Sequence, residues 1–267
     1  MRKYSAILGL IILAACNGTD DKKYVDPDAI PAKTPVISYT VIAQYPHDTS
    51  AYTQGLEFHN GKLYEGTGDY ETSSLRITDY KTGKVERKHM MGKDSIFGEG
   101  ITIFKNKIYQ LTWESHVVYV YDVANIDKPI KTFNWPYEGW GLTNNGTDLI
   151  ISDGTTKLFF VNPDDFRLKS TISITENGSP VQFLNELEYI DGFVFANIYQ
   201  TDKIVKIDPA SGFVVGKMDF TGMKEKFFAD KITPRTDVLN GIAYDSATKK
   251  FLITGKRWPK MFELKLN

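Results

Sequence analysis

One short phrase recurs five times along this chain, and it constrains the fold more than any other feature of the sequence. Each copy sets a polar or aromatic residue near an aliphatic one, as in Gln54-Gly55-Leu56 and Glu99-Gly100-Ile101. The copies span residues 53–58, 98–103, 139–143, 184–189 and 239–244, with spacings of 45, 41, 45 and 55 residues. Self-similarity at such a period indicates a repeat architecture in which each unit packs against its neighbours.

Every copy is followed by a turn and by further runs rich in β-branched and aromatic residues. In the second unit these runs are 107–109, 117–121 and 131–135. Four strands per unit at a period of about 40–45 residues is typical of a β-propeller blade. A β-sandwich would also contain many short strands, but it would not repeat one phrase at a fixed period. The sequence therefore predicts an all-β chain folded as a five-bladed β-propeller.

The two ends of the repeat region complement each other. The last repeat ends at Asn267 after its third strand, while an unassigned strand at 36–45 precedes the first repeat. We therefore expect the N-terminal strand to complete and close the last blade, which would leave no large open edge. The longer final spacing falls around residues 222–237, where 223–228 has a helical pattern, so we expect an insertion there on one face.

The N-terminus has the pattern of an export signal. Residues 1–15 combine basic Arg2 and Lys3 with an apolar run at 6–13, and the small residues that follow end at Cys16. This ending looks like a bacterial lipobox, in which the signal is cut before the cysteine and the cysteine is lipidated. The polar segment 16–35 is expected to be a flexible tether for a propeller domain at 36–267. The prediction is an exported bacterial lipoprotein, anchored in a membrane through Cys16 on its periplasmic or cell-surface side.

Composition removes several classes of function. The chain has 32 Lys and Arg against 33 Asp and Glu, so a net charge of −1 gives no electrostatic reason to expect nucleic acid as a partner. One cysteine and four scattered histidines cannot form a disulfide framework or the usual zinc ligand spacings. We therefore expect no metal, and function must come from a local site.

In a propeller the first strand of each blade lines the central channel, so equivalent positions near its start form a ring. In this chain the ring is Gln54, Glu99, Trp140, Asn185 and Asn240. These residues are mostly polar and differ between units, whereas the glycine and aliphatic residues around them repeat. The pattern favours a site at this end of the channel.

A second ring follows fourteen residues later, at the expected end of the second strand. Its members are Gly68, Trp113, Gly154 and Tyr199, together with Lys256 once a longer turn in the last unit is allowed for. The two rings contain no nucleophile paired with a base and no set of metal ligands. The chemistry left to them is proton transfer by Glu99 and oxyanion stabilisation by Asn185 and Lys256, between aromatic walls.

The phrases, taken in order, resemble those of the glutamine cyclotransferase family, the plant and bacterial type of glutaminyl cyclase. The matching segments are 52–56, 64–68, 97–100, 139–142, 152–154, 184–189, 239–243 and 254–260, so the resemblance covers roughly residues 38–267. Members of this family are five-bladed propellers that convert the N-terminal glutamine of peptides into pyroglutamate with release of ammonia. The resemblance implies a glutaminyl-peptide cyclotransferase that needs no cofactor and whose partners are peptides or proteins with N-terminal glutamine.

The resemblance also implies a role for individual residues. Glu99 matches the catalytic acid/base, and Asn185 and Lys256 match the groups that hold the γ-carbonyl oxygen. The positions that match or join the substrate pocket are Tyr52, Gln54, Trp113, Trp140, Tyr199 and Asn240. Two of them depart from the family pattern, since Tyr52 stands where Phe is common and Tyr199 where Trp is usual. We expect the protein to act as a monomer.

Two other functions fit a propeller. A non-catalytic relative could bind peptide N-termini, although such a protein is expected to lose the carboxylate first and Glu99 is present. A lactonase or hydrolase would need a channel metal held by several acids. Addition of a chelator would abolish the activity of such a metal-dependent enzyme but not that of a cyclase.

Overall fold

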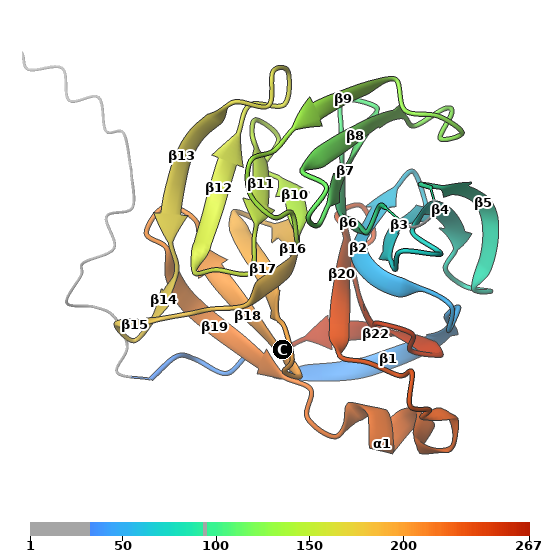
Figure 1. The fold of residues 1–267 in the computed structure, drawn as a ribbon. Coiled ribbons are helices and arrows are strands. Elements are labelled where there is room, and N and C mark those ends of the chain that lie inside the picture. The colour runs from blue at the N-terminus through green and yellow to red at the C-terminus, as the bar shows by residue number, and fades with distance from the viewer. Residues whose placement is uncertain (1–32, 93–94) are drawn as a thin grey trace, which may run out of the picture. The chain divides into compact units, whose positions relative to one another are not determined.

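The computed structural model describes residues 33–92 and 95–267. In this part of the chain five sheets are arranged in a ring around a common centre, and nearly all regular structure is β-strand (Figure 1). The predicted five-bladed β-propeller is therefore confirmed.

The first three blades are four-stranded antiparallel sheets with their strands in sequence order. The first contains β2 (Tyr52–His59), β3 (Lys62–Gly68), β4 (Ser74–Asp79) and β5 (Lys84–Met90). The second contains β6 (Gly98–Phe104), β7 (Lys107–Thr112), β8 (Val117–Asp122) and β9 (Lys131–Asn134). The third contains β10 (Leu142–Asn144), β11 (Leu149–Ser152), β12 (Lys157–Val161) and β13 (Leu168–Ser173).

The fourth blade carries a small addition at its outer edge. Its main strands are β16 (Leu184–Ile190), β17 (Phe193–Ile198), β18 (Lys203–Asp208) and β19 (Phe213–Asp219). The hairpin β14 (Thr175–Glu176) and β15 (Ser179–Pro180) joins this sheet through a parallel pairing of Thr175 with Phe213.

The fifth sheet combines strands from far apart in the sequence. It contains β20 (Leu239–Asp245), β21 (Lys250–Gly255), β22 (Lys260–Leu266) and β1 (Tyr39–Pro46). β1 pairs antiparallel with β22, with Tyr39 opposite Leu266. It begins at Tyr39 rather than at Val36 as the sequence predicted, because Val36 forms a bridge with Lys217 at the outer strand of the fourth blade.

The insertion between β19 and β20 is helical, as predicted. It forms α1 (Met223–Phe228) and the 3₁₀ turn η2 (Ala229–Lys231). Met223 and Phe228 are buried, and the Phe228 ring lies 5.3 Å from that of Trp258. None of the helices in the described residues is long and apolar enough to cross a membrane.

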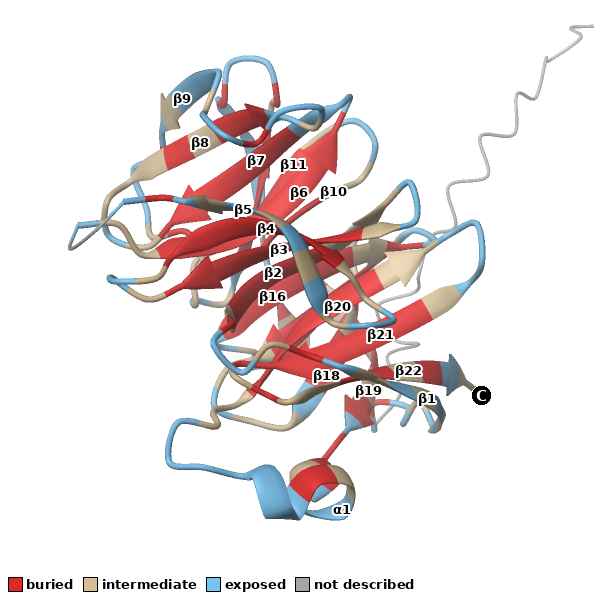
Figure 2. Cartoon of the chain, turned by 90° about the vertical axis from the view of Figure 1, so that its right-hand side faces the viewer, coloured by how far each residue is buried: buried red, intermediate tan, exposed pale blue. Residues whose placement is uncertain are grey.

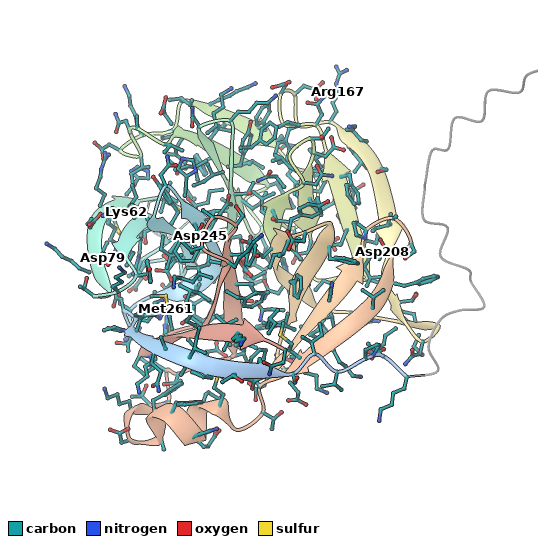
Figure 3. All side chains as sticks on the ribbon, turned by 180° about the vertical axis from the view of Figure 1, so that it is seen from behind. Lys62, Asp79, Arg167, Asp208, Asp245 and Met261 are labelled. Carbon is teal, nitrogen blue, oxygen red and sulfur yellow. The ribbon has the colours of Figure 1, made fainter. Side chains whose placement is uncertain are left out.

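The hydrophobic core lies between neighbouring blades. Leu56 and Leu63 of the first blade pack with Leu252 and Met261 of the fifth, and burial of each such side chain contributes roughly 1.5–3 kcal/mol. Figure 2 shows the buried residues concentrated along the strands, with exposed residues at the turns. Charged side chains such as that of Arg167 project from the outer margin of the ring (Figure 3).

The repeated phrase folds as a β-bulge in the innermost strand of four blades. The pairing register shifts at Thr53/Gly55, Gly98/Ile101, Leu184/Leu187 and Leu239/Ile242. Each shift brackets one member of the first predicted ring. Because bulges turn side chains away from the regular ladder, the phrase supplies the local geometry that a site needs.

The glycine of the phrase allows inner strands of neighbouring blades to approach closely. A Cβ added at Gly100 would lie 2.6 Å from the nitrogen of Leu142 and 2.7 Å from the carbonyl oxygen of Trp140. The Gly100 N–H donates to that carbonyl at 2.8 Å. In the fourth blade the same position holds Glu186, whose carboxylate accepts from the backbone N–H groups of Leu56 and Ile242. Glu186 thus links three blades.

Candidate active site

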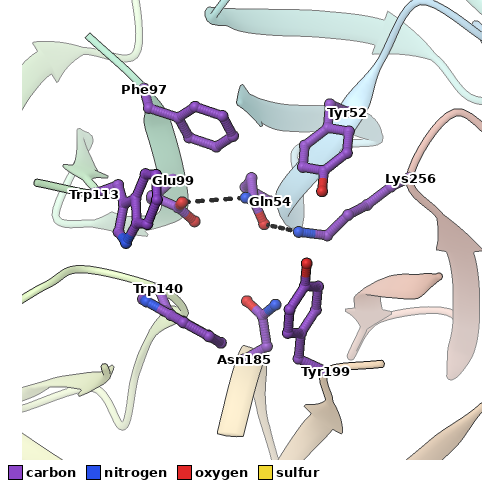
Figure 4. Close-up of a pocket in the computed structure, with 9 residues that line it drawn as sticks. All are labelled: Tyr52, Gln54, Phe97, Glu99, Trp113, Trp140, Asn185, Tyr199 and Lys256. Carbon is purple, nitrogen blue, oxygen red and sulfur yellow. Dashed lines mark hydrogen bonds between the residues drawn. The ribbon is translucent and has the colours of Figure 1, made fainter. Parts of the chain in front are cut away.

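A cavity of about 250 Å³ opens at the end of the channel where the innermost strands begin. Figure 4 shows the residues around it, which are Tyr52, Gln54, Phe97, Glu99, Trp113, Trp140, Asn185, Tyr199 and Lys256. They come from all five blades. The structure therefore brings together the three residues predicted to be catalytic and five of the six predicted to bind substrate.

The polar residues of the cavity sit on the two predicted rings. Gln54, Glu99 and Asn185 occupy the bulges of β2, β6 and β16. Lys256 follows the end of β21, at the level of the second ring. All four side chains are almost fully buried, with Glu99 4% and Lys256 2% exposed.

A line of hydrogen bonds joins Lys256, Gln54 and Glu99. The Lys256 Nζ donates to Gln54 Oε1 at 2.6 Å, and Gln54 Nε2 donates to Glu99 Oε1 at 3.1 Å. Since Lys256 can only donate and an ionised Glu99 can only accept, this arrangement fixes the orientation of the Gln54 amide.

Burial shifts the pKa values of the two ionisable groups in this line of hydrogen bonds, Glu99 and Lys256. It raises the pKa of Glu99 well above its usual value; the charge of Lys256 opposes this rise and that of Glu138 adds to it. Burial also lowers the pKa of Lys256 to about 8, against the stabilising charges of Glu99 and Asp237. A carboxyl group whose pKa is raised from its usual value is suited to take up and return a proton.

Aromatic rings form most of the cavity wall. Trp140 meets Tyr199 edge to face at 5.5 Å, and Phe97 meets Trp113 at 5.7 Å. The Lys256 ammonium lies 4.4 Å from the centroid of the Tyr52 ring. Such walls exclude water and favour a cationic group held between them.

Gly68 and Gly154, two members of the second predicted ring of positions, leave space for the aromatic side chains of the cavity wall. A Cβ added at Gly154 would lie 2.7 Å from the indole of Trp140, and one added at Gly68 would overlap the ring of Phe97. Glycine at these positions is therefore required by the neighbouring aromatic side chain.

Asn185 faces the cavity with spare hydrogen-bonding capacity. Its side chain is 2% exposed, and its Oδ1 has no hydrogen-bond partner among the described residues. A buried polar atom without a partner costs free energy unless a ligand supplies one.

Asn240 lies behind the cavity and not in its wall. Its Nδ2 donates to the carbonyl oxygen of Thr53 at 2.9 Å and approaches Gln54 Oε1 at 3.3 Å. It thus supports Gln54 from the neighbouring blade, where the sequence had placed it in direct contact with substrate.

Sequence reasoning missed Phe97 in the wall and Glu138 beside it. Both lie two residues before a member of the first ring, as Tyr52 does. Glu138 accepts hydrogen bonds from the indole nitrogens of Trp113 and Trp140. A comparison of this position across the five units would have identified both residues.

Two further predictions concern other parts of the chain. Across residues 33–92 and 95–267, no three His, Cys, Asp or Glu side chains gather where they could hold a metal ion. Cys16, the predicted lipidation site, lies outside the described residues.

Comparison with known proteins agrees with the geometry. A sequence model of the glutamine cyclotransferase family matches residues 8–266. A protein of Arabidopsis thaliana named glutaminyl-peptide cyclotransferase is 39% identical over 228 residues, which is 85% of this chain and 70% of the plant protein. The crystal structure of Myxococcus xanthus glutaminyl cyclase superposes with a TM-score of 0.81 at 34% identity, covering 88% of this chain and 99% of that one. The chain belongs to the glutamine cyclotransferase family.

Proposed function

We propose that this protein is a glutaminyl-peptide cyclotransferase, which converts the N-terminal glutamine of peptides or proteins into pyroglutamate and releases ammonia. The observation that carries the proposal is the position of Glu99, a buried carboxyl group with a raised pKa inside an aromatic cavity. The family and the names of the relatives support the same activity.

Glu99 acts as the general acid and base. It takes a proton from the substrate α-ammonium, and the resulting amine attacks the γ-carbonyl carbon of the same glutamine. Glu99 then returns the proton to the amide nitrogen. As the ring closes, the attacking nitrogen gives up its second proton to the same departing group, which leaves as ammonium, the protonated form of ammonia. One positioned acid/base contributes about 10²–10⁴-fold to such a reaction.

The γ-carbonyl oxygen gains negative charge as the amine attacks. Asn185 and Lys256 stabilise it, since one offers a buried amide and the other a buried ammonium. One donor of this kind is worth roughly 10²–10³-fold. Because the reaction is intramolecular, the rest of the site has only to fold the glutamine side chain back and exclude water. These steps use side chains of the protein alone and no cofactor.

The test uses the full chain in mild detergent and a short peptide with N-terminal glutamine. We expect ammonia release and the matching mass loss, in the presence of a chelator, and loss of turnover in Glu99→Gln. The matched control is Glu114→Gln, an exposed carboxylate that does not line the cavity. No turnover by the folded chain with several glutamine peptides would instead leave a non-catalytic peptide-binding propeller.

We also propose that the protein is an exported lipoprotein that acts as a monomer on a membrane surface. The support is the signal pattern of residues 1–15 and the single cysteine at position 16. Labelling with a radioactive fatty acid should mark the wild type and not Cys16→Ser, and light scattering of the detergent-solubilised chain should give one copy per particle.

A further inference from the structure

Glu138 is bound by three of the four tryptophans of the chain. Its Oε2 accepts from Trp113 Nε1 at 2.7 Å and from Trp140 Nε1 at 2.9 Å. Its backbone carbonyl accepts from Trp135 Nε1 at 3.2 Å. One carboxylate oxygen therefore joins two rings that line the cavity, one from the second blade and one from the third.

The contact with Glu138 holds both indoles at their ring nitrogens. Backbone hydrogen bonds from Trp113 N–H to the Phe97 carbonyl and from Trp140 N–H to the Ser152 carbonyl place the two residues, but they do not set the rotation of the side chains. Each indole has a single N–H donor, and a carboxylate is a strong acceptor for it. Glu138 thus sets the rotation of both rings from outside the cavity lining.

The charge of Glu138 adds a second effect. Hydrogen bonding to a carboxylate polarises the donor, so each indole face becomes more attractive to a cation. The substrate of the proposed reaction enters as an α-ammonium, and this cation must be held near Glu99 before its proton is removed.

We propose that Glu138 is a positioning residue of this active site, which orients Trp113 and Trp140 and, through them, binds the substrate ammonium. The inference rests on the proposed function for the identity of the cation, while the contact itself is a property of the free protein. Its role differs from that of Glu99, because Glu138 contacts the two rings and does not itself line the cavity.

The first experiment measures the indole N–H resonances of the ligand-free full chain in detergent by ¹H–¹⁵N NMR. Replacement of each tryptophan by phenylalanine assigns the four signals. In Glu138→Ala we expect the Trp113 and Trp140 signals to move and to exchange faster with water. The Trp135 and Trp258 signals are internal controls, because their donors bind backbone carbonyl oxygens of Glu138 and Asp237.

The second experiment measures kcat and KM with an N-terminal glutamine peptide. Loss of cation binding by a pair of rings corresponds to about a tenfold rise in KM for Glu138→Ala, with a smaller change in kcat. Glu138→Gln keeps an acceptor oxygen without the charge, so it should restore the indole signals and recover only part of the KM. Glu114→Gln should match the wild type in both measurements.

The outcomes separate this inference from the proposed function. Unchanged Trp113 and Trp140 signals in Glu138→Ala overturn the inference, as does an unchanged KM in an active enzyme. If the wild type does not turn over glutamine peptides, the proposed function fails. In that case the indole N–H signals alone test whether Glu138 orients the two rings, since they do not depend on turnover.

Discussion

The ammonium of Lys256 lies 2.6 Å from the side-chain oxygen of Gln54, in a region where both residues are almost fully buried. The amide of Gln54 also donates to Glu99, so it fixes the positions of Lys256 and Glu99 relative to each other. The arrangement keeps a buried charge hydrogen-bonded before substrate arrives, and a buried charge without a partner would be costly.

Replacing Gln54 by methionine should reduce kcat while the protein stays folded. The variant keeps the side-chain length but leaves Lys256 without its acceptor and Glu99 without its donor. A hydrogen bond to a charged group contributes about 1.5–3 kcal/mol, so we expect a loss of roughly 10- to 100-fold in kcat. Steady-state kinetics with a glutamine peptide measures the loss.

The matched control for this variant is Gln110→Met. Gln110 is also fully buried, but it lies on β7 away from the cavity. It should keep its kcat even if the free energy of unfolding falls. Equal loss of kcat in both variants would contradict a specific role for Gln54.

The pH profile of kcat/KM should be bell-shaped. Glu99 must be ionised to accept a proton, so activity falls as the pH drops through its raised pKa. Lys256 must be charged to hold the oxyanion, so activity falls again as the pH rises above about 8. A pH titration of the initial rate measures both limbs.

Replacing Glu138 by glutamine should shift only the acid limb of the pH profile of kcat/KM. The charge of Glu138 raises the pKa of Glu99, so Glu138→Gln should lower that pKa and extend activity to lower pH. Glu114→Gln should leave the profile unchanged. A shift of the acid limb to higher pH would contradict the assignment of that limb to Glu99.

The sequence predicted the ring of polar residues well because one local structure recurs. Gln54, Glu99 and Asn185 all stand at the bulge that the repeated phrase encodes, so their positions within the phrase fix their level in the channel. Periodicity alone also predicted five blades, since the main strands of four blades are consecutive in the sequence and the fifth blade adds only β1 to three consecutive strands.

Asn240 shows what the spacing of the repeat does not predict. It occupies the same bulge position, yet its amide binds the Thr53 carbonyl of the next blade and not the cavity. Spacing fixes the level of a residue along the channel, whereas the choice between cavity and neighbouring blade depends on contacts between units. Phe97 and Glu138 share a repeat position that a comparison of the units would have shown, but their contacts with the indoles of Trp113 and Trp140 are visible only in the structure.

His47 should make stability depend on pH. Its Nδ1 bonds to the carbonyl oxygen of Trp258 at 2.7 Å and its Nε2 lies 3.0 Å from the carboxylate of Glu65, and two acceptors at these distances favour the protonated ring. Burial alone would lower the pKa of His47, but the charge and hydrogen bond of Glu65 outweigh it and raise the pKa. The resulting stability is complete below the unfolded pKa of about 6.5 and is lost as the pH rises through the folded pKa.

Urea unfolding of the wild type and His47→Ala checks this expectation. The substitution removes one member of a buried ion pair, so it should cost about 3–5 kcal/mol at pH ~6. The difference between the two proteins should shrink as the pH rises through the raised pKa of His47 in the folded wild type, where the ring loses its proton. A constant difference over that range would show that His47 is neutral in the folded protein.

Gly154 and Gly146 offer a matched pair of substitutions. Both have positive φ, +77° and +83°, so alanine at either position should cost about 1–2 kcal/mol of stability. A Cβ at Gly154 would lie 2.7 Å from the Trp140 ring, whereas one at Gly146 meets nothing within 4 Å. Gly154→Ala should therefore displace Trp140 and raise KM by about tenfold, since a misplacement of about 1 Å can cost up to 10²-fold. Gly146→Ala should lose similar stability with unchanged KM, and a KM that rises equally in both would assign the effect to backbone strain rather than to the aromatic wall.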